Sequence, residues 1–109
     1  MSRMPLVFIV AGLLVLPGIV GAQSGYRVGQ KNKTFSIALL LIKPGDQVTF
    51  DNDDQITHNV YSTHKGSTFN SKAQAPGDSK SVTFASEGTF EIRCAFHPKM
   101  KMSVIVKKR

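Results

Sequence analysis

The chain has 109 residues, which is room for one small domain and excludes a multidomain enzyme. Hydrophobic residues make up 41% of it and charged residues 19%, so we expect a folded core rather than a disordered chain. Its net charge of +7 favours acidic partners of any class, whether a protein face, a membrane surface or nucleic acid.

Residues 1–22 have the three regions of a secretory signal. Arg3 supplies the basic start, an apolar run extends from Leu6 to Leu16, and small residues end at Ala22. We therefore expect a cleaved signal peptide, a single mature domain over residues 23–109 with a net charge of +6, and export to the bacterial periplasm. The alternative is an uncleaved leader that holds the protein at a membrane, although the apolar run is shorter than the ~20 residues that a span needs.

The segment Leu39–Ile42 is apolar at every position. Alternation places Leu40 and Ile42 inside and leaves Leu39 and Leu41 exposed. The segment is therefore either buried on both faces or part of a contact patch, and its pattern does not decide between these.

Period-two alternation continues along the chain, and no segment is typical of an amphipathic helix. Pro and Gly in Lys43–Asp46 and Ala75–Asp78 predict turns. Between these turns the polar run Asn52–Gln55 interrupts the chain, and Glu87-Gly88 ends a later strand. The residues expected to point inward from the strands are Val48, Phe50, Ile56, His58, Val60, Val82 and Phe84.

Two further strands complete the pattern. In Thr89–Cys94, alternation predicts that Phe90, Ile92 and Cys94 point into the core. In the last strand Met102, Val104 and Val106 share one face, and residues 107–109 form a basic tail. The sequence thus predicts an all-β fold, a two-sheet Greek-key β-sandwich of about seven to eight strands.

Cys94 is the only cysteine of a chain that is expected to be exported. It has no partner for an internal disulfide, which leaves intermolecular pairing, a buried thiol or a metal thiolate. The segment Cys94-Ala95-Phe96-His97-Pro98-Lys99-Met100 places a thiolate, an imidazole and a thioether within seven residues. This proximity favours the metal thiolate.

His58 supplies a second imidazole from an upstream strand, and its parity points its ring inward. Two nitrogens, one thiolate and a weak sulfur ligand are a donor set that suits copper in both of its common oxidation states. Asn59 is expected to join the His58 strand to the Cys94 loop and so to support the ligands. Alone, each residue has an ordinary explanation as core or surface; the combination predicts a copper site.

These motifs resemble the cupredoxins, the type 1 blue copper proteins, and most closely their amicyanin and plastocyanin branch. The resemblance lies in His58-Asn59-Val60, in Cys94-x-x-His97-Pro98-x-Met100, in the two Pro-Gly turns and in the valine-rich last strand. It implies one copper ion at His58, Cys94, His97 and Met100, with Asn59 behind them. Phe96 departs from the family, whose members commonly have proline before the second histidine.

Two positions need separate treatment. Met102 is an alternative axial ligand, but it is in phase with Val104 and Val106 and is explained as a core residue, so Met100 is preferred. His64 lies in a polar segment and is expected to be exposed, outside the copper site.

The expected function is one-electron transfer between redox proteins by a monomer that is not an enzyme and has no small-molecule substrate. The edge of His97, within an apolar ring from Phe96 and Pro98, would be the electron port. Acidic docking faces of the donor and acceptor would meet a basic rim, for which a plain solvated surface is the alternative. The expected rim residues are Lys65, Lys99 and Lys101.

Nucleic-acid binding is not expected, since the chain has two tyrosines, no tryptophan and no recognised motif. Two rival functions use the same fold. One is a periplasmic copper carrier or storage protein with the same ligands. The other is an enzyme accessory domain held at a membrane by its leader.

Overall fold

Nine strands and no helix form the regular structure of residues 24–108, the part of the chain that the computed structural model describes. The strands are β1 (Gly25–Lys31), β2 (Thr34–Phe35), β3 (Leu39–Ile42), β4 (Asp46–Asn52), β5 (Tyr61–Ser62), β6 (Phe69–Asn70), β7 (Ser79–Phe84), β8 (Gly88–Arg93) and β9 (Lys101–Val106). Within this range no helix has the length and apolarity to cross a membrane. The predicted signal peptide and its cleavage site lie outside the described residues.

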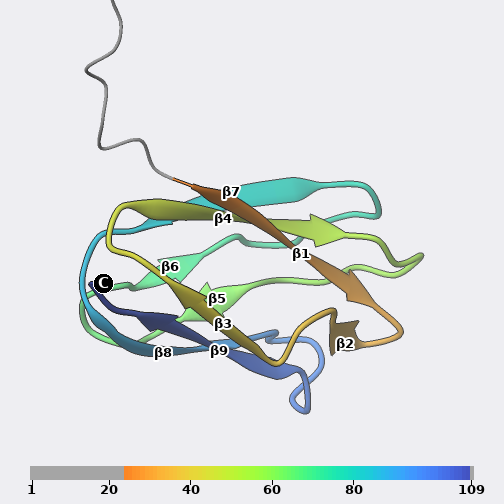
Figure 1. Cartoon of the computed structure of the whole chain (residues 1–109). Coiled ribbons are helices and arrows are strands. Elements are labelled where there is room, and N and C mark those ends of the chain that lie inside the picture. Colours follow the sequence, from red (N-terminus) through yellow and green to blue (C-terminus); the bar gives the residue numbers. More distant parts are fainter. Residues whose placement is uncertain (1–23, 109) are drawn as a thin grey trace, which may run out of the picture.

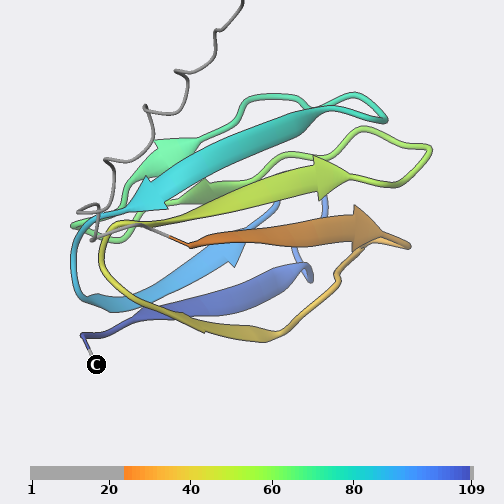
Figure 2. The same cartoon turned by 45° about the horizontal axis from the view of Figure 1, so that its top comes forward.

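The strands form two sheets that face each other (Figures 1 and 2). One has the order β2-β1-β4-β7 and the other the order β3-β9-β8-β5-β6. Each sheet is mixed, since β1 runs parallel to β4 and β3 parallel to β9, while the pairs β4–β7 and β8–β9 are antiparallel. The predicted all-β sandwich is confirmed. The structure has more strands than predicted because β2, β5 and β6, with two residues each, are too short to show a periodic pattern.

Both predicted Pro-Gly turns are present and have the same construction. In the first, Asp46 N donates to Lys43 O, Gly45 has a φ of 95°, and Lys43 N donates to the Asp46 carboxylate. In the second, Gly77 has a φ of 90° and Ala75 N donates to the Asp78 carboxylate. Glycine is required here because other residues rarely adopt a positive φ.

The core lies between the sheets and follows the predicted alternation. Phe90, Ile92 and Cys94 are buried on β8 and just after it, and the inward residues of β9 are buried as well. Val82 is only half-buried because β7 is an edge strand of its sheet. The prediction for Ile56 is wrong: it is 39% exposed, because it lies in an irregular bend, and the buried part of this segment begins only at His58.

Strand β3 forms the edge of the larger sheet, and its burial is one-sided. Ile42 is buried and Leu40 half-buried, whereas Leu39 and Leu41 are 55% and 48% exposed. The possibility that the segment is buried on both faces is therefore excluded. The two leucines lie on the surface beside β9, with Leu39 opposite Ser103 and Leu41 opposite Ile105.

Candidate metal centre

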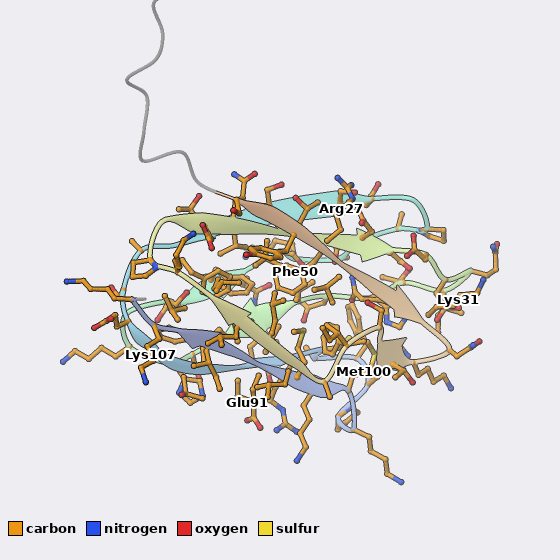
Figure 3. All side chains as sticks on the ribbon, in the orientation of Figure 1. Arg27, Lys31, Phe50, Glu91, Met100 and Lys107 are labelled. Atoms are coloured by element: carbon orange, nitrogen blue, oxygen red, sulfur yellow. The ribbon has the colours of Figure 1, made fainter. Side chains whose placement is uncertain are left out.

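Four strand ends meet at one end of the sandwich and carry the predicted ligands there. Strands β1 and β4 run parallel and terminate together, and β8 terminates where its antiparallel partner β9 begins. Figure 1 shows these ends on the same side of the sandwich. In Figure 3, Met100 and Lys31 lie toward this end and Lys107 lies toward the opposite one. The segment that joins β8 to β9 is the predicted ligand loop, residues 94–100.

The structure brings His58, Cys94 and His97 together as a three-donor cluster. Cys94 Sγ lies 3.9 Å from His58 Nδ1 and 3.6 Å from His97 Nδ1, and the three donor atoms lie within 4.8 Å of one another. Two ligands on one ion with bonds of about 2.1 and 2.3 Å, separated by 110–120°, are about 3.6–3.8 Å apart. The measured separations therefore fit a single metal ion held by two nitrogens and one thiolate.

The ligand loop is folded by two successive backbone turns. His97 N donates to Cys94 O at 3.3 Å, and Met100 N donates to His97 O at 2.9 Å. The side chain of Arg93 donates to Pro98 O at 2.8 Å and so attaches the loop to the end of β8. Pro98 itself has a restricted φ. The loop thus turns the side chains of Cys94 and His97 toward the same point.

His97 is half-buried, in contrast to the buried Cys94. Burial lowers the pKa of the His97 imidazole, and electrostatic interactions with His58 and Lys33 lower it further. A neutral imidazole has a free lone pair for a metal. The environment of His97 therefore favours the form that can act as a ligand.

His58 is held by backbone as well as side-chain contacts. It forms an isolated β-bridge with Gln74, in which each backbone N–H donates to the other residue's carbonyl, at 3.0 and 2.7 Å. Its side chain is fully buried, and Nε2 lies 2.9 Å from Asp54 Oδ2. This hydrogen bond lowers the pKa of Asp54 to about 2, so the carboxylate is ionised at neutral pH.

Asn59 lies between the two ligand segments. Its Oδ1 accepts a hydrogen bond from Ala95 N at 2.9 Å, and its Nδ2 donates to Asn70 Oδ1 and to Lys72 O. The side chain of Asn59 therefore links the residue after His58 to the residue after Cys94, which is the contact that the sequence predicts.

The two methionines occupy different surroundings. Met102 lies within β9 opposite Ile92, as a member of the β8–β9 ladder with its side chain in the core. Met100 is the last residue of the ligand loop, is also buried, and lines the same surface hollow as His97. Met100 is therefore part of the ligand loop, whereas Met102 is part of the β8–β9 ladder.

His64 lies outside the cluster, as the sequence predicts. It is exposed, and its ring packs edge-on against Phe90 with the centroids 6.5 Å apart.

The predicted position of Lys65 at the basic rim is wrong. Gly66 lies beside Phe90 and Ser86, near the start of β8, so the loop that carries Lys65 is at the end away from the ligands. Lys65 is therefore not part of the basic rim.

A surface hollow of about 420 Å³ lies over the ligand loop. Its lining residues are Lys33, Phe96, His97, Pro98, Lys99 and Met100. Phe96 is 53% exposed at its surface. Lys33, in the turn between β1 and β2, takes the place expected for Lys65. Sequence reasoning missed it because the turn lies far from the loop along the chain.

Three buried amides behind His58 were also missed. Gln74 Oε1 accepts from Gln30 Nε2 at 3.0 Å, and Gln74 Nε2 donates to Phe50 O. Asn52 Nδ2 donates to both Ile56 O and Gln74 O at 2.9 Å. These contacts hold the segment before His58 against β4. In the sequence, Asn52 and Asp54 belong to a polar run that indicates only an interruption between strands. The spacing of four residues between Asp54 and His58 was the available signal for their contact.

Comparison with known proteins agrees with this geometry. Residues 25–107 match a family described as copper binding proteins, plastocyanin/azurin family. The chain is similar to a purple cupredoxin from Nitrosopumilus maritimus, with 28% identity and a TM-score of 0.68 over 75% of this chain and 99% of the other. It is also similar to a reduced amicyanin variant, with 28% identity and a TM-score of 0.69 over 76% and 82% of the two chains.

A larger protein shares the fold alone. A copper-containing nitrite reductase from Thermus scotoductus SA-01 is 22% identical with a TM-score of 0.72, over 78% of this chain and only 23% of that one. No curated protein matches the chain.

Proposed function

Because the chain belongs to the plastocyanin/azurin family of copper-binding proteins, as a cupredoxin near amicyanin, we propose that it transfers single electrons between redox proteins and catalyses no reaction of its own. The observation that carries the proposal is the convergence of one thiolate sulfur and two imidazole nitrogens within 4.8 Å at one end of the sandwich. Bound copper supplies a one-electron couple, so that a donor protein loses one electron and an acceptor protein gains it.

Each ligand would have a separate role. Cys94 would supply the thiolate, His58 and His97 the two nitrogens, and Met100 the weak axial sulfur. The backbone bridge at His58 and the Asn59 contact to Ala95 hold these groups in place through the fold itself. A donor set fixed in this way rearranges little when the charge on the metal changes, and this favours fast electron transfer.

The hollow over the ligand loop is the proposed docking site. Its lining includes the half-buried His97 with Phe96 and Pro98, and Lys33 and Lys99 contribute its positive charges. An apolar centre with a basic rim suits a redox protein that presents an acidic face, in a small and short-lived complex.

The backbone at Lys33 supports this use of the surface. Asn32 and Lys33 both have a positive φ, of 55° and 57°, in the two-residue turn between β1 and β2. Such turns favour Asn followed by Gly, because glycine adopts a positive φ without strain. A lysine at the second position places a charge at the rim at some cost in backbone energy, which is typical of a functional residue. We propose that this exchange occurs after export, in the compartment that the predicted signal peptide specifies.

The test is to add Cu(II) to the purified protein and record its visible and electron paramagnetic resonance spectra. An intense thiolate-to-copper absorption band that disappears on reduction and returns on oxidation is expected. Absence of the band would contradict the proposal. A challenge with a strong copper chelator separates it from copper delivery: slow loss of the band is expected, and rapid transfer of copper to the chelator would instead favour a carrier.

A further inference from the structure

Asp54 contacts the proposed copper ligand His58 on the side of the ring away from the thiolate. Asp54 Oδ2 lies 2.9 Å from His58 Nε2, whereas Cys94 Sγ lies near His58 Nδ1. The His58 side chain is fully buried and that of Asp54 is 14% exposed, so little water competes for this contact.

The chemistry of the carboxylate fixes the proton on the ring. An ionised carboxylate only accepts hydrogen bonds, so the hydrogen in this contact belongs to Nε2 of His58. A neutral imidazole with its proton on Nε2 has its lone pair on Nδ1. Asp54 therefore selects the tautomer whose lone pair faces Cys94 and the proposed copper position.

Asp54 is itself held in one orientation. Its Oδ1 accepts from Gln55 N at 3.0 Å, and its Oδ2 also accepts from Lys33 N at 3.3 Å. Its own N–H donates to Asn52 Oδ1 at 2.9 Å. These contacts join the turn after β4 to the turn after β1. The Asp54 carboxylate is thus a fixed hydrogen-bond acceptor rather than a diffuse negative charge.

We propose that Asp54 is a positioning residue for the copper ligand His58, which sets the binding nitrogen and strengthens the imidazole as a donor to Cu(II) more than to Cu(I). This inference rests on the proposed function. Hydrogen bonds from a ligand imidazole to a carboxylate raise the basicity of the ligand, and their loss commonly costs ten- to a hundredfold in metal affinity, as an order of magnitude. A more basic donor stabilises the more highly charged ion.

The test compares Asp54→Asn with Asp53→Asn. Both variants remove one carboxylate from the same turn, but Asp53 is exposed and makes no contact with His58. Asp54→Asn is expected to lower the Cu(II) affinity about ten- to a hundredfold, as in other such contacts. If the fall in Cu(I) affinity is ten times smaller than the fall in Cu(II) affinity, the reduction potential rises by about 59 mV. Asp53→Asn is expected to change both quantities little, and Asp54→Glu should restore part of the Asp54→Asn loss.

Equal changes in the two asparagine variants would overturn the inference, because they would reflect net charge alone. Unchanged Cu(II) affinity and potential in Asp54→Asn would overturn it as well. A measurement on the unmodified protein covers a variant that does not fold: ¹⁵N spectra of the metal-free protein are expected to place the proton of the neutral His58 imidazole on Nε2, and a proton on Nδ1 would contradict the inference. If the unmodified protein shows no thiolate band, the proposed function fails instead.

Discussion

The two imidazoles of the centre come from contrasting parts of the molecule. His58 is fully buried, paired through its backbone with Gln74 and through its ring with Asp54. His97 lies in a short loop between strands, is half-buried, and contributes to a surface hollow with Phe96. One ligand is therefore held by the body of the sandwich, and the other by a loop that reaches solvent.

This difference separates two requirements of a protein that exchanges electrons with partners. A centre must hold its donors in place, which the contacts around His58 do from the interior. It must also come close to a partner, which the exposed side of His97 allows. Cys94 connects the two halves, since it ends the β8 alternation in the core and begins the ligand loop. Substitutions in the three parts should then have different effects.

The largest effect is expected from Cys94→Ser, which removes the donor that both halves share. The thiolate-to-copper band should disappear completely, because an alcohol oxygen cannot supply that transition. The fold should remain, since serine is a little smaller than cysteine and the remaining core is unchanged; the loss of stability should be about 1–3 kcal/mol from the buried hydroxyl. Visible spectra and far-ultraviolet circular dichroism measure the two outcomes. A band that persists would show that the thiolate is not a ligand.

The same division explains how much the sequence could predict. Alternation predicted β8 and β9 and the inward side of Cys94, because burial on one face imposes a period of two. The spacing of the loop predicted His97 and Met100 as ligands, since their side chains and that of Cys94 lie within seven residues of the sequence. Lys33 was not predicted, because its place beside the ligand loop depends on a contact between the turns after β4 and β1, and no local pattern encodes that contact. Asp54 was not predicted either, although its spacing of four residues from His58 was an available signal.

The prediction of the copper ligands nevertheless required two kinds of signal, the alternation along the strands and the resemblance to a known motif. His58 is 36 residues from Cys94 and was placed by its parity and by its resemblance to a known motif. The parity was reliable at His58 and Val60, where the chain is extended and buried, but failed at Ile56 in the bend before them. The polar run Asn52–Gln55 marked this bend without revealing that it holds the ring of His58.

The next largest effect is expected in the ligand loop and is tested by comparing Met100→Leu with Met102→Leu. Removal of a weak axial sulfur should keep the thiolate band and raise the reduction potential, because the electron density that the sulfur donates in a fixed site stabilises Cu(II) more than Cu(I). A tenfold change in the ratio of the two affinities corresponds to about 59 mV. Met102→Leu should leave the potential unchanged and cost less than about 1.5 kcal/mol in stability, as a volume-conserving core change. Protein-film voltammetry measures the potential. A shift in Met102→Leu alone would reverse the axial assignment.

The smallest effect is expected at the rim of the hollow, from Lys99→Gln and Lys33→Gln. Hexacyanoferrate(III), a small anionic oxidant, should accept electrons from the reduced protein about two- to fivefold more slowly in each variant at low salt, because a positive charge near His97 concentrates the anion there. Lys107→Gln is the matched control, since Lys107 lies at the opposite end of the molecule (Figure 3), and its rate should equal that of the unmodified protein. The difference should vanish near 1 M salt, where charges are screened within about 3 Å. If Lys107→Gln slows the reaction as much as Lys99→Gln, the oxidant senses net charge, and the open side of His97 has no special role in electron exchange.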